Sequence, residues 1–206
     1  MAANYNNSAW FYDRLSKLIY GKALVQSQVY LLKFVPAKSR ILIVGGGTGW
    51  ILEEIAKIHP SGLVITYIEV APKMVMLSRK RKAGNNEIVF INEPVENVSL
   101  RNDFDVVITP FLFDNFIEEN FQKIFSHIHS ALKPGGLWLN ADFRLTGKWW
   151  QKVILRSMFL FFRAICGIEA NHLPDIWNTF ERYRYLEIDK ASFFGDFILS
   201  VAYRKS

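Results

Sequence analysis

Between residues 40 and 145, short apolar runs alternate with amphipathic stretches. The apolar runs have the near-continuous hydrophobic character of strands buried on both faces of a parallel sheet; they are 40–45, 63–70, 87–92, 104–113 and 135–143. The stretches 50–59, 72–83 and 116–132 show the periodicity of amphipathic helices. The alternation predicts a doubly wound α/β layer with right-handed crossovers and helices on both faces.

Three further segments extend this layer. Residues 5–35 predict an aromatic-rich helical region before the first strand, and residues 147–170 predict a long apolar helix after the fifth. Residues 182–188 and 193–205 predict two strands joined by a short connection, as in an edge hairpin. We therefore expect a Rossmann-like sheet of seven strands, mostly parallel, with an antiparallel C-terminal edge strand.

Composition narrows the class of protein. Half of the 206 residues are apolar and 15% are aromatic, which is enough for a packed core. The single cysteine, Cys166, excludes an internal disulfide and a cysteine-based metal site. The N-terminus lacks the layout of a signal peptide, and the most apolar run, 153–168, carries Arg156 and Arg163. That run is too short and too charged for a membrane span, so we expect a soluble, cytoplasmic protein.

The basic residues are only modestly in excess, with 25 Lys and Arg against 19 Asp and Glu. Their densest run, 78–84, falls at the end of a predicted helix, where cations meet the partial negative charge of the carbonyls. No nucleic-acid-binding motif accompanies it. The sequence predicts a solvated helix end and no nucleic-acid partner.

A glycine-rich loop, "GGGTG" (45–49), directly follows the first predicted strand. The first βα turn is where open α/β sheets bind ligands, facing the amides of the next helix. A dinucleotide fingerprint needs a glycine where Trp50 stands, and no Gly-Lys-Ser/Thr of a P-loop follows. Glu69, at the end of the second strand, is placed to accept hydrogen bonds from ribose hydroxyls. Together these features favour an adenosine-type ligand without a pyrophosphate.

Four motifs at this spacing resemble the class I S-adenosylmethionine-dependent methyltransferases. They are "ILIVGGGTG" (41–49), Glu69, "FDVVITPFLFDNF" (104–116) and "LKPGGLWLNADF" (132–143). The similarity covers residues 40–145, while 11–28 looks like the lead-in helices of small-molecule members. The resemblance implies S-adenosyl-L-methionine as cofactor and S-adenosyl-L-homocysteine as product.

Carried over by position, the resemblance implies a cofactor on the carboxyl edge of the sheet. The loop would pass beneath its methionine part, Glu69 would hold its ribose, and the other residues would border the adenine or the sulfonium. The implied cofactor-binding residues of the first, second and fourth strands are Gly45, Gly46, Gly47, Thr48, Gly49, Glu69, Val70, Met74, Thr109 and Pro110.

The chain departs from the family pattern in two places. Ile43 stands where many members carry an aspartate two residues before the first glycine. After the third strand, Pro94 takes the place of the aspartate that accepts from the adenine amino group. Glu93 is the substitute acceptor, and the amide of Val95 remains able to meet the adenine ring.

Methyl transfer from a sulfonium is an in-line displacement, so the protein mainly aligns the acceptor and excludes water. A general base helps when the acceptor is a hydroxyl or a protonated amine. The candidates are Asp114, Asp142 and His172, although a helix cap, a loop carboxylate and a surface histidine are the respective structural alternatives. His127 and His129 point to different sides of one helix, so no metal site is predicted.

The segment 147–167 bears on the substrate. It is broadly apolar, with Lys148, Lys152, Arg156 and Arg163 interspersed. It either packs as core on the sheet or forms a lid over an apolar acceptor pocket, with transient contact to a membrane that holds a lipid-like substrate. Tyr12 and Tyr20 are expected to close the opposite side of the site and are counted with the cofactor-binding residues.

We therefore predict a methyltransferase for a small, apolar acceptor in a single domain. Residues 1–36 form a helical lead-in, 37–145 the cofactor-binding core, 146–178 a helical cap and 179–206 the strand pair. Two alternatives remain: an aminopropyltransferase like spermidine synthase, disfavoured by the basic, apolar cap, and a noncatalytic S-adenosylmethionine-binding module or partner subunit.

Overall fold

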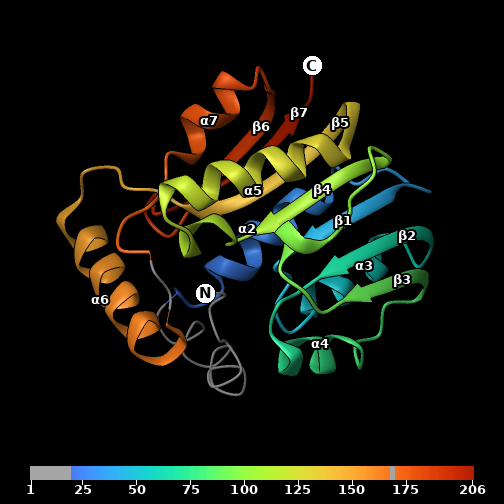
Figure 1. Ribbon diagram of the computed structural model, residues 1–206, viewed down its shortest axis with the longest axis horizontal. Helices are drawn as coiled ribbons and strands as arrows, with labels where there is room; N and C mark the ends of the chain where they lie inside the picture. Colours follow the sequence, from blue (N-terminus) through green and yellow to red (C-terminus); the bar gives the residue numbers. More distant parts are fainter. Residues whose placement is uncertain (1–19, 168–169) are drawn as a thin grey trace.

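The computed structural model describes residues 20–167 and 170–206, which form a mixed sheet flanked by helices (Figure 1). Its seven strands lie in the order β3-β2-β1-β4-β5-β7-β6. Strand β7 is antiparallel to both of its neighbours, and β6 lies at the edge. The strands are β1 (Arg40–Val44), β2 (Ser61–Ile68), β3 (Asn85–Ile91), β4 (Phe104–Pro110), β5 (Leu132–Phe143), β6 (Leu186–Phe193) and β7 (Ile198–Arg204). The predicted α/β fold is confirmed.

Helices cover both faces of this sheet. They are α2 (Ala23–Leu32), α3 (Trp50–Ile58), α4 (Pro72–Ser78), α5 (Glu118–Ala131), α6 (Trp149–Cys166) and α7 (Ile176–Arg182). Single 3₁₀ turns, Val95–Asn97 and Phe113–Asn115, follow β3 and β4. Helix α6 lies at the rim of the molecule, on the opposite side from α3 and α4 (Figure 1). Within the described residues, no helix is long and apolar enough to cross a bilayer.

The two covered faces explain why the buried part of β1 is apolar. In β1, Ile41 and Ile43 pack into the cluster that includes α2 and α3. Leu42 and Val44 point the other way, into the cluster built on Phe121 and other residues of α5. Because side chains alternate along a strand and both faces are covered, Ile41 to Val44 are all apolar, and the charged Arg40 stands at the exposed start of β1. The order of strands reverses between β1 and β4, which opens a crevice at their carboxyl ends.

The C-terminal hairpin differs in position from the prediction. Residues up to Arg182 belong to α7, β6 continues to Phe193, and the turn occupies 194–197. The backbone explains the shift, because Phe194, Gly195 and Asp196 all have positive φ values of 48°, 58° and 65°. The predicted strand 193–205 therefore contained the turn itself, and the strand at 182–188 was placed about four residues too early.

Candidate active site

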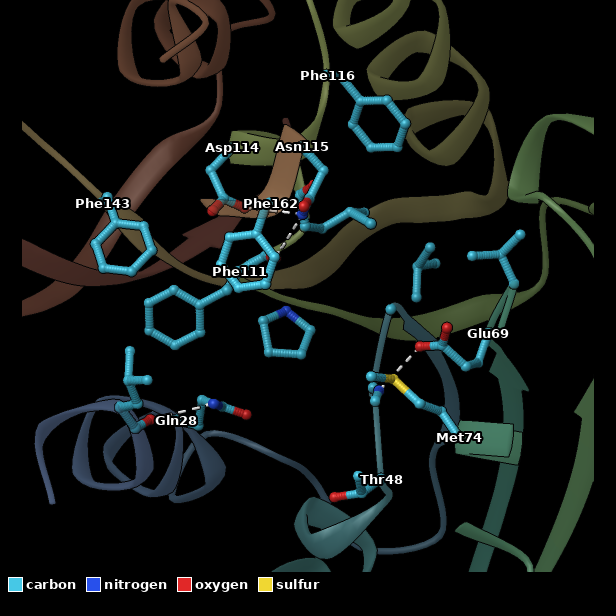
Figure 2. A pocket seen from close by; sticks show the side chains of 18 of the residues that line it. Gln28, Thr48, Glu69, Met74, Phe111, Asp114, Asn115, Phe116, Phe143 and Phe162 are labelled. Carbon is cyan, nitrogen blue, oxygen red and sulfur yellow. Dashed lines mark hydrogen bonds between the residues drawn. The ribbon is translucent and has the colours of Figure 1, made fainter. Parts of the chain in front are cut away.

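A cavity of about 1260 Å³ opens at the carboxyl ends of β1, β2 and β4. Figure 2 shows Glu69 and Met74 on one side of it and the rings of Phe111 and Phe143 on the other. Helices α2 and α6 add further lining residues, including Gln28 and Phe162. Several elements far apart in the sequence therefore meet around one cavity, where open α/β sheets bind their ligands.

The glycine loop forms one wall of this cavity. Gly45, Gly47 and Gly49 have left-handed φ values of 72°, 62° and 78°, which side chains other than glycine adopt at a cost. A Cβ atom on Gly46 would lie 2.4 Å from Tyr67 Oη, and one on Gly49 would lie 2.4 Å from Ser78 Cβ. A Cβ atom on Gly47 would meet only Met74 Sδ, at 3.9 Å. Gly46 and Gly49 thus serve close packing, whereas Gly47 leaves its backbone open to the cavity.

Glu69 ties the end of β2 to this loop. Its Oε2 accepts the backbone N–H of Gly47 at 3.0 Å, and its Oε1 accepts the N–H of Ala71 at 2.9 Å. Only 5% of the residue is exposed. Burial raises the pKa of its carboxyl, while these N–H donors act in the opposite direction. The carboxylate is thereby fixed at the cavity wall with lone pairs left to accept further hydrogen bonds.

Arg81 is a loop residue that the sequence did not single out. Its Nε donates to the carbonyl of Thr48 at 3.0 Å, and a terminal nitrogen lies 3.5 Å from a Glu53 carboxylate oxygen. It also lines the cavity. The basic run was predicted as a solvated helix end; for Arg81 that prediction was wrong, because its side chain folds back onto the glycine loop.

Asn92 is a second missed contributor, and it braces the turn after β2. Its side-chain amide donates to the carbonyls of Glu69 and Val70 at 2.8 and 3.0 Å. Nothing in the sequence pattern distinguishes it from other loop asparagines, since the contact depends on β2 and β3 being neighbours.

Comparisons with known proteins decide the family. A family model described as a methyltransferase domain matches residues 41–136. The ubiquinone/menaquinone biosynthesis C-methyltransferase UbiE of Wigglesworthia glossinidia brevipalpis is 30% identical over 194 residues, covering 88% of this chain and 72% of that protein. The chain belongs to the family of class I S-adenosylmethionine-dependent methyltransferases. S-adenosylmethionine is accordingly its cofactor.

Two other similarities are more limited. A malonyl-acyl-carrier-protein O-methyltransferase of Bacillus cereus is 29% identical over 129 residues, which is 60% of this chain and 46% of that protein. The chain thus spans about half of that relative. Magnesium protoporphyrin IX methyltransferase of Synechocystis shares the fold with a TM-score of 0.67 at 16% identity, covering 98% of this chain and 97% of that one.

The methyltransferase cavity fits this cofactor. Gly47 leaves space where any other residue would project a Cβ atom, and Glu69 presents a fixed acceptor. Val70, Met74, Glu93, Pro94 and Val95 line the same end of the cavity. The departure at Ile43 does not reach it, because that side chain is fully buried in the cluster with α2 and α3.

Asp114 and Asp142 are brought together, although only Asp114 lines the cavity. Asp142 is fully buried, and its carboxylate accepts the backbone N–H groups of Phe113 at 3.1 Å and Phe143 at 2.8 Å. Burial raises the pKa of Asp142 to about 7. Burial and the nearby Asp142 charge raise the pKa of Asp114 well above its usual range. Because Asp142 accepts two backbone N–H groups that favour its ionised form, Asp114 is the carboxyl of this pair that more readily keeps its proton.

The opposite end of the methyltransferase cavity is apolar. Tyr20 packs on Phe143 with ring centroids 5.5 Å apart, and its hydroxyl donates to Met158 Sδ at 3.5 Å. Burial and then the Asp114 charge raise the pKa of Tyr20. Phe111, at the end of β4, holds a positive φ of 51° that turns the chain into the cavity wall. The α6 residues Ile154, Met158 and Phe162 complete this end.

The remaining predicted site residues divide into those that lie away from the cavity and those that line it. Thr109 is on the cavity's strand but faces the α5 side, where it donates to Asn140 Oδ1 and accepts from Trp138 Nε1, both at 2.8 Å. Gly49 is the left-handed residue before α3 and does not line the cavity. His172 is exposed and contacts Asn171. Tyr12 lies outside the described residues. Gly45, Gly46, Thr48 and Pro110 do line the cavity.

The two helical histidines have separate structural partners. His127 Nε2 lies 3.0 Å from the carbonyl of Val98, and His129 Nδ1 lies 2.9 Å from the hydroxyl of Tyr185. Among the described residues, no group of three or more His, Cys, Asp or Glu side chains is arranged to hold a metal ion.

Proposed function

We propose that the chain transfers a methyl group from S-adenosylmethionine to a small, apolar acceptor, which includes lipid-like molecules. One observation carries this proposal. The same cavity runs from the glycine loop and Glu69 to a chamber walled by Phe111, Phe143 and Phe162 (Figure 2). A cofactor at the first end faces an acceptor at the second, and apolar walls select an apolar acceptor.

The cofactor end divides into three parts under this proposal. Glu69 accepts hydrogen bonds from the ribose hydroxyls, and the backbone of Gly45 to Thr48 meets the methionine part. Val70, Met74 and Val95 flank the adenine, with Glu93 as the acceptor in place of the missing aspartate. When bound, S-adenosylmethionine supplies a methyl group on a cationic sulfur, already activated for displacement.

The protein's own contribution is alignment and the exclusion of water. The rings at the acceptor end, with Tyr20 and Met158, desolvate the reacting atoms. Asp114 is the only carboxyl of the predicted catalytic set that lines the cavity. Once it has lost its proton, it accepts one from an acceptor hydroxyl or ammonium group. Asp142 is a positioning residue, since it fixes the backbone of Phe113 directly before Asp114.

The organisation of the chain follows the same division. We propose residues 37–145 as the cofactor-binding core and 146–178 as the cap over the acceptor end. Residues 179–206 begin with the last turn of α7 and continue into the strand pair that completes the sheet. Residues 1–36 form the lead-in, of which Tyr20 and α2 border the cavity.

The proposal is tested by label transfer. Purified protein is incubated with S-adenosylmethionine carrying a tritiated methyl group and a cell extract, and products are partitioned between organic solvent and water. We expect enzyme-dependent label in the organic phase, strongly reduced in Glu69→Ala. Label confined to water-soluble products would overturn the apolar acceptor. Calorimetry with S-adenosylhomocysteine and NADH checks the cofactor, and tight binding of NADH alone would contradict the cofactor assignment.

A further inference from the structure

We propose that α6 docks on the surface of an anionic phospholipid membrane and that the cavity receives its acceptor there. The inference rests on the proposed function, because it supplies the route of an apolar acceptor. The contact surface is the outer stripe of α6, which consists of Trp149, Lys152, Val153, Arg156, Leu160 and Arg163.

The outer stripe is a continuous surface. At 3.6 residues per turn its six members fall within an arc of about 100°. Along that arc the apolar members form one half and the basic members the other. Leu155 and Phe159, elsewhere on the helix, are buried against Phe197 and neighbouring residues. The packing of α6 on the protein therefore leaves the stripe outward.

The apolar half is unusually exposed for a soluble protein. Trp149, Val153 and Leu160 are 76%, 54% and 68% exposed. Leu155 and Phe159 anchor α6 in a hydrophobic core cluster, and none of the three exposed side chains belongs to that cluster. An indole and two aliphatic side chains on a helix with a cationic flank are the chemistry of interfacial membrane helices.

The basic half of the stripe indicates that the partner surface is negatively charged. Lys152, Arg156 and Arg163 are exposed. Nine ion pairs join described residues of the protein, and none of the nine involves these three cations. The segment 148–167 contains no Asp or Glu. Its uncompensated charge complements an anionic lipid surface. The same charge disfavours self-association, because a second copy presents an equally cationic stripe.

The stripe borders the opening of the cavity. Val153 belongs both to the stripe and to the cavity lining, and the adjacent Ser157 lines the cavity while remaining exposed. On the other side, Val25 of α2 lines the cavity and is 42% exposed. A membrane in contact with the stripe therefore meets the apolar opening directly, so an acceptor can pass from lipid to cavity without crossing water.

Co-sedimentation of the full chain with vesicles tests this inference. We expect binding to vesicles of phosphatidylcholine with about a third phosphatidylserine, weakened at high salt, and little binding to phosphatidylcholine alone. Lys152→Glu with Arg156→Glu should reduce binding at least tenfold, and Trp149→Ser with Leu160→Ser severalfold. The matched control is Lys80→Glu with Arg101→Glu, which makes the same charge change at exposed positions away from α6.

The proposal would be overturned if wild-type protein did not bind anionic vesicles at low salt, or if the control pair lost binding equally. If the wild-type protein were a dimer and the α6 substitutions dissociated it, the stripe would be an interface with a second copy, and the membrane proposal would also be overturned. S-adenosylhomocysteine binding, measured by calorimetry, should be unchanged in every variant. That readout separates failure of membrane docking from failure of the proposed methyltransferase function.

Discussion

Glu69 Oε2 accepts the backbone N–H of Gly47 at 3.0 Å, so the carboxylate that ends β2 and the turn that ends β1 form one unit. Tyr67 reinforces this unit, because its hydroxyl donates to the Gly47 carbonyl at 3.0 Å. The N–H and the carbonyl of Gly47 are thus both hydrogen-bonded to side chains at the end of β2. A ligand lying on Gly47 therefore meets a loop that is ordered before it binds.

Glu69→Ala removes both a ligand acceptor and the tether of the loop. Hydrogen bonds to charged groups contribute about 1.5–3 kcal/mol, so we expect S-adenosylhomocysteine affinity to fall at least roughly tenfold, as measured by calorimetry. Glu87→Ala, an exposed carboxylate on β3, is the control and should leave affinity unchanged. An unaltered affinity in Glu69→Ala would remove Glu69 from the cofactor site.

Gly46→Ala and Gly47→Ala should fail in different ways. A methyl group on Gly46 collides with Tyr67, and overpacking of this kind costs about 1–3 kcal/mol of the free energy of unfolding. A methyl group on Gly47 has room in the protein but projects toward the cavity and costs about 1–2 kcal/mol through its left-handed backbone.

Denaturant unfolding and calorimetry separate these effects. We expect Gly47→Ala to stay folded and lose S-adenosylhomocysteine binding by more than its stability loss accounts for. For Gly46→Ala we expect the main effect to be a lower free energy of unfolding. If Gly47→Ala bound the ligand as wild type does, the ligand would not lie on this backbone.

Arg81→Gln tests whether the guanidinium holds the loop in its binding conformation. The bond from Arg81 Nε to the Thr48 carbonyl is charge-assisted but half-buried, so we expect a loss of affinity of about three- to tenfold. Lys80→Gln, next in sequence and exposed, removes the same charge without the contact and should have no effect. Equal losses in both variants would indicate a general electrostatic attraction instead.

The sequence predicted that the glycine loop and Glu69 lie together at one edge of the sheet, because that arrangement follows from where the strands end. Gly45 and Glu69 terminate adjacent parallel strands, so their meeting is a property of the topology. Arg81 could not be chosen from its run of cations, since only the tertiary fold brings one of them to Thr48. Thr109 was carried over by motif, yet it shares a face with Val107, whose side chain packs in the α5 cluster. Its alternation along β4 turns it away from the cavity.

For the Asp114–Asp142 pair, too, the sequence indicates the candidate residues, while the tertiary fold decides how they meet. Asp114 was a candidate from its position just past a strand and Asp142 from its position at the end of one. Their proximity depends on the turn at Phe113–Asn115 folding back over β5. Burial, which decides their protonation, is invisible in the local sequence. The C-terminal hairpin was misplaced for a local reason, since the turn at Gly195 was hidden between aromatic residues with strand propensity.

Asp114→Asn should increase stability in a manner that depends on pH. Burial and Asp142 raise the pKa of Asp114 above the value of the unfolded chain, so the folded state binds the proton more tightly. The stability that this proton provides is complete below about pH 4 and is lost as pH rises through the folded-state pKa, by at most about 1.4 kcal/mol per pH unit. Asparagine has no charge to bury, so the variant should match wild type near pH 4 and exceed it increasingly toward neutral pH.

Urea unfolding from pH 4 to 8 measures this difference, with methyl transfer measured on the same samples. The control is Asp196→Asn, at an exposed position where Lys148 lowers the pKa of the carboxyl. Its stability relative to wild type should be nearly constant above about pH 5, because that carboxyl is by then ionised in both the folded and the unfolded chain. Wild-type activity should rise with pH as Asp114 loses its proton and becomes able to accept one, and Asp114→Asn should lose that rise. A stability difference that stays constant across the pH range would show that Asp114 titrates normally, and an unchanged pH profile of activity would exclude it as the base.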